Sequence, residues 1–184
     1  MALSPNINIM LRAAEKAARS LLRDFGEVEQ LQVSRKGPGD FVSAADHRSE
    51  EIIYEALSKA RPDYSFLMEE RGEVGDKGSE FRWIVDPLDG TSNFLHGIPH
   101  WNISIALEQN GEIIAGIVYD PVKDEMFRAE KGLGAFMRNR RLRVSGRDQM
   151  EAAVVASARG DPWQLVEEVD VERGAGAGRD GLRQ

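Results

Sequence analysis

Residues 86–93 read Asp-Pro-Leu-Asp-Gly-Thr-Ser-Asn, and they follow the run Phe-Arg-Trp-Ile-Val at residues 81–85. This run is aromatic and β-branched, which predicts a buried strand that carries Asp86 to the edge of a sheet. Pro87 is expected to stop the strand because proline cannot donate a ladder hydrogen bond. From Gly90 onward the sequence predicts the start of a helix, whose free N–H groups would bind an anion. Two carboxylates beside such a helix start indicate a metal-bound phosphate.

The same motif could be an ordinary surface turn, because Asp, Pro and Gly are the commonest turn residues. The flanking residues favour a site instead. Residues 81–85 before the motif and Asn-Phe-Leu at 93–95 after it bury both sides of a doubly acidic loop. Burying acids is costly unless a cation or a hydrogen-bond donor compensates them. We therefore expect cations at the carboxylates and a phosphate at the backbone amides.

Composition limits the classes of protein to which the chain can belong. It has 184 residues, 41% hydrophobic and 30% charged, which suits one globular domain. No apolar run approaches the ~20 residues that span a bilayer, and the N-terminus lacks a secretory signal, so the cytoplasm is expected. The absence of cysteine excludes disulfides and thiolate metal sites. A net charge of −7 makes nucleic acid an unfavourable partner but permits a phosphorylated small molecule bound through metal ions.

Two helices are expected ahead of the motif. Ser4-Pro5 predicts a helix start, apolar residues then recur at spacings of three and four, and Gly26 is expected to end the helix. Ser43 is expected to cap a second helix that runs to about Arg61. Both helices have an apolar face, so they should pack on a common core.

Strands are expected on both sides of the motif. Residues 31–34 could form a short strand, and residues 64–68 predict a strand that ends at Glu69. Residues 101–145 alternate polar with apolar and carry frequent turn signals, including Asn-Gly at 110–111, which predicts an antiparallel meander. Two helices and this meander predict an α+β fold in layers.

Three motifs occur in a fixed order along the chain: Lys36-x-x-x-Asp40-x-Val42-Ser43-x-x-Asp46, Met68-Glu69-Glu70, and Trp83-Ile-Val-Asp86-Pro-Leu-Asp89-Gly-Thr91-Ser-Asn93-Phe94. In these motifs and in the spacing between them, the chain resembles the inositol monophosphatase family, and most of all its bacterial extragenic-suppressor branch. The resemblance covers roughly residues 5–157. It implies a sugar-phosphatase-like fold, a layered sandwich of paired N-terminal helices on an antiparallel sheet.

The resemblance also implies a metal centre. Glu69, Asp86 and Asp89 would be metal ligands, and the carbonyl of Leu88 would complete the shell of the first metal. Mg²⁺ suits oxygen ligands of this kind and takes phosphate oxygens as further partners. Three acids that converge in one crevice would repel each other and raise each other's pKa unless cations neutralise them.

The implied reaction is the in-line attack of a water that one ion activates, while a second ion stabilises the leaving oxygen. Glu69, together with Thr91 hydrogen-bonded to Asp46, is implied to orient and deprotonate that water. The amides of Gly90 and Thr91 would hold the phosphate. Two further residues are placed by the resemblance at the edge of the substrate, Ser92 and Lys36.

Some of these residues also have purely structural explanations. Asp46 could simply complement the dipole in the first turn of the second helix. Lys36 and Asp40 fit a turn, and Glu70 fits a solvated neighbour of the site. Hydrogen-bonded surface positions are expected for the three histidines, because none has a histidine partner at metal-ligand spacing.

The family pattern is incomplete within these 184 residues. The resemblance implies a second α/β half with a Trp-Asp-x-Ala-Ala-Gly motif whose Asp binds the second metal, and the chain does not contain this motif. We expect residues 1–157 to form the N-terminal phosphatase domain and residues 158–184 to be a divergent, poorly ordered tail. A sheet face left uncovered would favour oligomerisation, so a homodimer is expected.

The sequence thus leaves two functions open. The first is a Mg²⁺-dependent phosphomonoesterase that acts on inositol 1-phosphate or a related sugar phosphate, a small phosphorylated polyol. The alternative is a catalytically impaired protein that retains a metal or phosphate site and acts through protein contacts. A Mg²⁺-dependent rise in melting temperature without phosphate release would favour the alternative.

Overall fold

The computed structural model describes residues 3–31 and 38–146. By its contacts the chain divides into two units, Met1–Ser145 and Gly146–Gln184, and the fold below is that of the first. The domain boundary expected at residue 157 and the expected tail lie outside the described residues, so both stay predictions.

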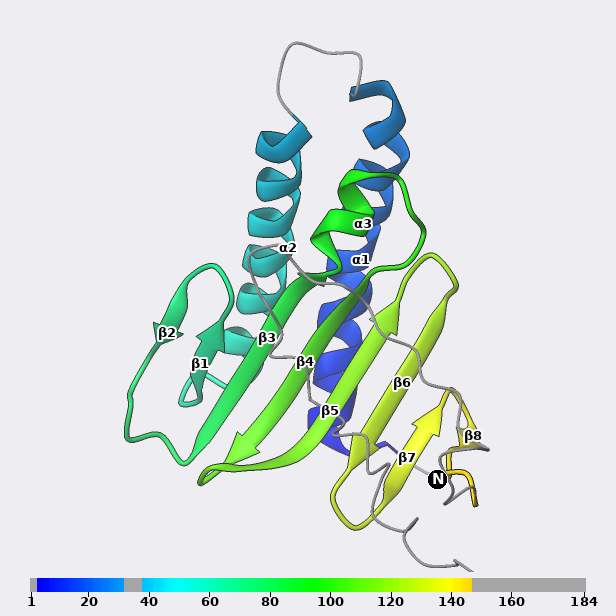
Figure 1. The fold of residues 1–184 in the computed structure, drawn as a ribbon. Coiled ribbons are helices and arrows are strands. Elements are labelled where there is room, and N and C mark those ends of the chain that lie inside the picture. Colours follow the sequence, from blue (N-terminus) through cyan, green and yellow to red (C-terminus); the bar gives the residue numbers. More distant parts are fainter. Residues whose placement is uncertain (1–2, 32–37, 147–184) are drawn as a thin grey trace, which may run out of the picture. The chain divides into compact units, whose positions relative to one another are not determined.

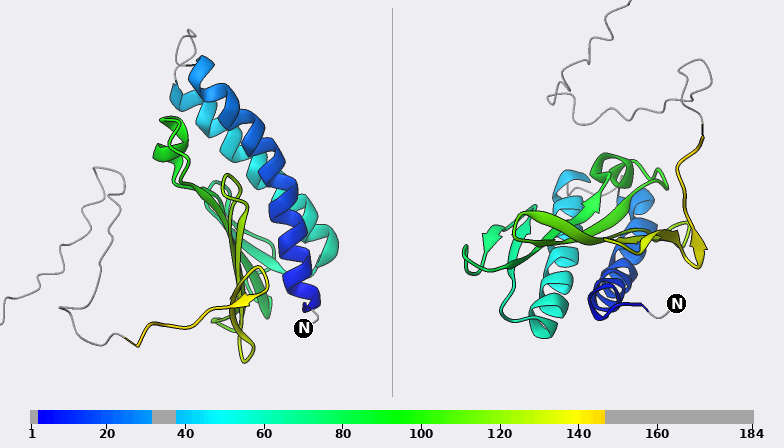
Figure 2. Two further views of the ribbon diagram at one scale, coloured as in Figure 1. Left: turned by 90° about the vertical axis from the view of Figure 1, so that its right-hand side faces the viewer. Right: turned by 90° about the horizontal axis from the view of Figure 1, so that it is seen from below.

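Two long helices, α1 (Pro5–Leu31) and α2 (Pro38–Ala60), pack against each other and against one face of a sheet (Figures 1 and 2). The start of α1 agrees with its predicted cap, because Ser4 Oγ accepts the N–H of Ile7 at 3.3 Å. None of the described helices is long and apolar enough to cross a membrane.

The second helix ends at Ala60, close to the predicted Arg61, but the predicted end of the first helix and the predicted start of the second are wrong. The first helix continues through Gly26 to Leu31, and the second begins at Pro38 rather than near Ser43. A glycine inside a helix costs only about 1 kcal/mol, and the extension buries Val28 in the core. Proline is favoured in the first turn of a helix, where its missing N–H is not needed. The strand expected at residues 31–34 is also wrong at Leu31, and the rest of it lies outside the described residues.

The sheet has eight strands among the described residues, in the order β2-β1-β3-β4-β5-β6-β7-β8. Every neighbouring pair is antiparallel except β1 and β3, which are parallel. The α+β sandwich of paired helices on a mostly antiparallel sheet is confirmed. The elements after α2 are β1 (Ser65–Met68), β2 (Gly72–Val74), β3 (Phe81–Asp89), α3 (Thr91–Leu95), β4 (Asn102–Gln109), β5 (Glu112–Asp120), β6 (Glu125–Glu130), β7 (Gly134–Met137) and β8 (Arg140–Arg141).

Strand β3 does not stop at Pro87, as the sequence had led us to expect. It continues to Asp89, and the register with β4 is irregular between Asp86 and Asp89. The two residues between them have no partner in the ladder, so the missing N–H of Pro87 costs no ladder hydrogen bond. The irregularity redirects the chain just where the acidic residues lie.

The core lies between the helices and the sheet face that they cover. Trp83 and Ile105 from the sheet are fully buried there together with Leu57 from α2. At the end of the sheet nearest the acidic motif, the rings of Phe25, Phe94 and Trp101 lie with centroids 5.1 to 5.5 Å apart. These rings fix the short helix α3 against α1, so the position of the Asp86–Asn93 motif is set by core packing.

Candidate functional site

Two strand ends place the first two acidic residues side by side. Because β1 and β3 are parallel neighbours, their carboxyl ends lie at the same edge of the sheet, and Met68 pairs with Val85. The next residues along the two strands are Glu69 and Asp86. Each of these carboxyl groups influences the pKa of the other, so the structure brings these two predicted ligands together.

The Asp86 loop is held by hydrogen bonds from inside itself and from α2. Oδ1 of Asp86 accepts the N–H of Leu88 at 3.2 Å, and Ser49 Oγ donates to the carbonyl of Pro87 at 2.9 Å. Leu88 is fully buried, which anchors the loop in the core. The carbonyl of Leu88, one of the predicted metal ligands, accepts the hydroxyl of Thr91 at 3.0 Å.

This last contact corrects the hydrogen bond that we expected between Thr91 and Asp46. Thr91 is the first residue of α3, and a threonine in that position readily donates to a carbonyl three residues earlier. A carbonyl has two lone pairs, so Leu88 can accept this bond and still offer an oxygen to a cation.

The remaining predicted residues lie around the same loop. Asp89 is exposed, and its Oδ2 accepts the amide of Asn102 at 2.7 Å. Gly90 precedes α3 in the left-handed conformation with φ of 90°, followed by Thr91 and by Ser92, which is exposed. Lys36 lies outside the described residues. The expected roles of the amides of Gly90 and Thr91 and of Ser92 stay predictions.

Asp46 reaches the acidic edge from α2. It is only 3% exposed, and its Oδ1 has no hydrogen-bond partner. Burial, reinforced by the negative charges of Glu70, Asp86 and Glu50, raises the pKa of Asp46 to about 7. A buried carboxylate oxygen without a donor is costly, and a cation would relieve that cost.

The pKa values of the two carboxyl groups at the strand ends, Glu69 and Asp86, are shifted in the same direction as that of Asp46. Burial raises the pKa of Asp86 to about 7, helped by the negative charge of Glu69. Burial also raises the pKa of Glu69. Among the described residues, no three Asp, Glu, His or Cys side chains stand as a ready-made metal cluster. The residues nevertheless fit a hard cation, because they supply only oxygen and place several acidic groups close together.

These raised pKa values predict how the stability of the metal-free protein depends on pH. Asp46 and Asp86 bind protons more tightly in the folded state than in the unfolded state, where Asp has a pKa of about 3.9. Their contribution is therefore fully present below about pH 4 and is lost as pH rises through about 7. In EDTA, Asp86→Asn should raise the free energy of unfolding relative to wild type at about pH 8, and this gain should shrink towards zero at about pH 4. Urea unfolding across this pH range checks the prediction, and a gain that is independent of pH would contradict it.

Sequence reasoning missed the two α2 residues that hold this edge, Ser49 and Glu50. Both are buried, at 0% and 1% exposure. A signal was available, because they follow Asp46 by three and four residues and so lie on the same face of the helix. Buried polar residues on the face that carries an acidic candidate indicate groups that support it.

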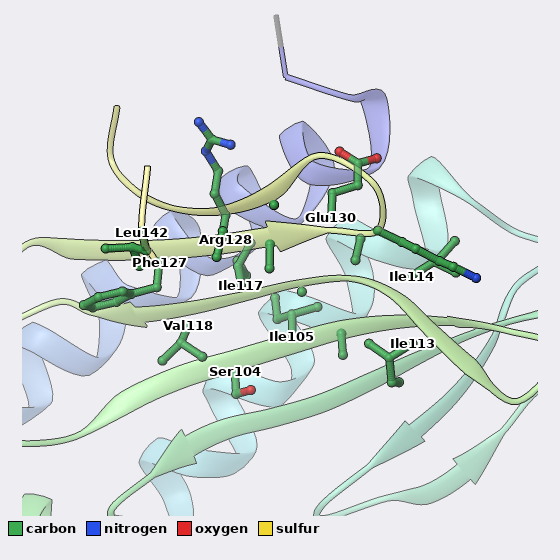
Figure 3. A pocket seen from close by; sticks show the side chains of 17 residues that line it. Ser104, Ile105, Ile113, Ile114, Ile117, Val118, Phe127, Arg128, Glu130 and Leu142 are labelled. Atoms are coloured by element: carbon green, nitrogen blue, oxygen red, sulfur yellow. The ribbon is translucent and has the colours of Figure 1, made fainter. Parts of the chain in front are cut away.

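A large cavity in the described part of the chain lies elsewhere, on the sheet face away from the helices (Figure 3). It has a volume of about 590 Å³ and is mostly apolar, with Ile113, Val118 and Phe127 in its wall. Glu130 is the one carboxylate in this wall, so the cavity lacks the group of acids that a divalent cation prefers. The predicted metal ligands Glu69, Asp86 and Asp89 lie outside this cavity.

Comparisons with known proteins identify a family that the chain resembles along most of its length. A family model described as the inositol monophosphatase family matches residues 2–170. An inositol-1-monophosphatase of Mesorhizobium japonicum is 61% identical over 155 residues, which are 84% of this chain and 58% of that protein. A protein of Pseudomonas aeruginosa named Nus factor SuhB is 40% identical over 157 residues, again 84% of this chain and 58% of the relative.

Solved structures give the same result. The crystal structure of the extragenic suppressor protein suhB from Bartonella henselae matches with a TM-score of 0.71 and 53% identity, over 80% of this chain and 57% of that one. An inositol monophosphatase from Anabaena matches with a TM-score of 0.65 and 36% identity, over 76% and 49% of the two chains. The chain spans a little under three fifths of the length of the curated relatives that it matches.

Proposed function

The chain belongs to the inositol monophosphatase family, and from this we propose that it acts as a Mg²⁺-dependent phosphomonoesterase on inositol 1-phosphate or a related sugar phosphate. The observation that carries the proposal is the acidic edge formed by Asp46, Glu69 and Asp86. These groups are held close together with raised pKa values and an unpartnered buried oxygen. Clusters of acids perturbed in this way are characteristic of catalytic sites.

Each part of the edge has a distinct task in this proposal. The carboxylates of Glu69, Asp86 and Asp89 and the carbonyl of Leu88 would hold Mg²⁺. The cation, when bound, would stabilise charge on the phosphate oxygens and lower the pKa of water. The hydrogen bond between the Leu88 amide and Asp86 Oδ1 fixes that carboxylate, so its other oxygen stays available as a ligand.

Proton transfer and phosphate binding are assigned to the neighbouring groups. Glu69 is the proton acceptor from the attacking water, and Thr91 orients that water through its hydroxyl oxygen. Thr91 Oγ1 can do this because its hydrogen is given to Leu88, which leaves its lone pairs free. Asp46 contributes negative charge at the edge, and the amides of Gly90 and Thr91 bind the phosphate.

The choice of substrate class rests on the relatives. The protein of M. japonicum, named inositol-1-monophosphatase, is 61% identical to this chain, whereas the protein of P. aeruginosa named Nus factor SuhB is 40% identical. The closer similarity to the first favours a phosphatase acting on a phosphorylated polyol. The homodimer expected from the uncovered sheet face stays a prediction.

The test is the release of inorganic phosphate from inositol 1-phosphate by the purified chain. Release should require Mg²⁺ and should stop when EDTA removes it, because the carboxylates alone leave the charge on the phosphate uncompensated. A calorimetric titration with Mg²⁺ alone, in the absence of substrate, measures binding independently of turnover. A folded chain that binds Mg²⁺ and releases no phosphate would contradict the enzymatic proposal.

A further inference from the structure

The backbone that follows Glu69 is clamped by a buried carboxylate that belongs to another element. Glu50 lies on α2 with 1% of its surface exposed, and its Oε2 accepts the backbone N–H of Glu70 at 2.8 Å. The other carboxylate oxygen, Oε1, lies 3.1 Å from Nε of Arg71. One side chain of α2 therefore contacts the two residues that come directly after the predicted ligand Glu69.

Arg71 is held in turn by two more residues of the same helix. Its guanidinium also pairs with Glu51, and it lies 4.9 Å from the ring centroid of Tyr54. The ring of Tyr54 packs on Phe66 of β1 with centroids 5.0 Å apart. The clamp is thus built from consecutive turns of α2 and is braced against the strand that leads to Glu69.

The consequence is that Glu69 is fixed on both sides. Met68, before it, is buried and paired with Val85 of β3. Glu70, after it, is held by Glu50. Glu69 lies at the start of the turn between β1 and β2. Without the hydrogen bond between the Glu70 amide and Glu50, its carboxylate would be free to rotate away from Asp86.

We propose that Glu50, together with Arg71, is a positioning residue for the acidic site: its grip on the Glu70 amide holds the Glu69 carboxylate beside Asp86, where both can bind one divalent cation. The inference rests on the proposed function, since it concerns the geometry of that same site. Packing alone does not require this carboxylate, because an apolar side chain fills a buried position on a helix at lower cost. Groups that orient metal ligands typically change metal affinity 10- to 100-fold when they are altered.

The test compares Glu50→Gln with the matched control Glu51→Gln. Both variants remove one negative charge from a partner of Arg71, but only Glu50 contacts the Glu70 amide. In Glu50→Gln the side chain has only one oxygen. If that oxygen accepts the Glu70 N–H, the NH₂ group faces the guanidinium of Arg71. If the NH₂ group turns away from Arg71, the Glu70 N–H loses its acceptor. We expect Mg²⁺ binding, measured by calorimetry with Mg²⁺ alone, to weaken about 10- to 100-fold in Glu50→Gln and to stay within about twofold in Glu51→Gln.

Two further readouts separate positioning from simple stabilisation. Hydrogen exchange of the Glu70 amide in the metal-free protein should become faster in Glu50→Gln, and saturating Mg²⁺ should restore most of kcat. Arg71→Lys, which keeps the charge but loses the Nε contact, should show a smaller shift in the same direction. Unchanged Mg²⁺ affinity in Glu50→Gln or Arg71→Lys, despite a lower melting temperature, would overturn the inference and leave the proposed function intact. A wild-type chain that binds no Mg²⁺ would instead reject the function, and the inference with it.

Discussion

The Asp86→Asn variant is expected to lose Mg²⁺-dependent phosphate release by about a thousandfold or more while keeping its fold. The substitution removes a proposed metal ligand from the end of β3, where the negative charge of Glu69 lies close by. A cation supplies several kcal/mol of transition-state stabilisation, and a loss of about 4 kcal/mol corresponds to a thousandfold in rate. The measurement is kcat/KM for inositol 1-phosphate at saturating Mg²⁺.

The fold should survive because the local hydrogen bond does not need the charge. Oδ1 of an asparagine can still accept the Leu88 amide, and the neutral side chain avoids the burial cost and the repulsion that raise the pKa of Asp86. Asp76→Asn is the matched control. Asp76 is exposed and accepts the amide of Gly78 at 2.9 Å in the same two-residue pattern, but it lies away from the acidic edge. Equal activity in the two variants would show that Asp86 is not part of the site.

The parts of this molecule that the sequence predicted are those set by local pattern. Alternation and the Asn-Gly turn at 110–111 predicted the hairpin of β4 and β5, and the apolar run at 81–85 predicted the strand that carries Asp86. The proximity of Glu69 and Asp86 also followed from their positions at two strand ends. It depended, however, on β1 and β3 being parallel, which pattern alone does not determine.

The parts that the sequence did not predict depend on tertiary contacts. Gly26 is a poor helix residue, yet burial of Val28 beyond it extends α1. Thr91 has an acceptor within its own loop, so it bonds to Leu88 rather than reaching Asp46. The clamp on Glu70 joins residues 20 positions apart, so no short motif identifies the two partners. Polar residues on the buried face of α2 were the one signal that it existed.

Gly90→Ala is expected to destabilise the protein by about 2 to 5 kcal/mol. Gly90 has φ of 90°, where an L side chain is strained by roughly 1 to 2 kcal/mol. Its Cβ would also lie 3.1 Å from the carbonyl oxygen of His100 and 3.2 Å from Cα of Trp101. Those are backbone atoms that cannot move without shifting β4, and overpacking of this kind adds about 1 to 3 kcal/mol.

A second glycine in the same region separates the two causes. Gly97 also has a positive φ, of 68°, but a Cβ built there would meet nothing within 4 Å. Gly97→Ala should therefore lose only the conformational part, about 1 kcal/mol. Urea unfolding measures the loss of unfolding free energy in each variant. The difference between the two losses is the contribution of the close approach between the Asp86–Asn93 motif and the start of β4. If the two variants lost the same stability, the approach would not be tight, and Trp101 would not be what holds the turn at Gly90 in place. Because that turn carries the amides assigned to phosphate, Gly90→Ala should also weaken binding of inorganic phosphate in the presence of Mg²⁺, whereas Gly97→Ala should not.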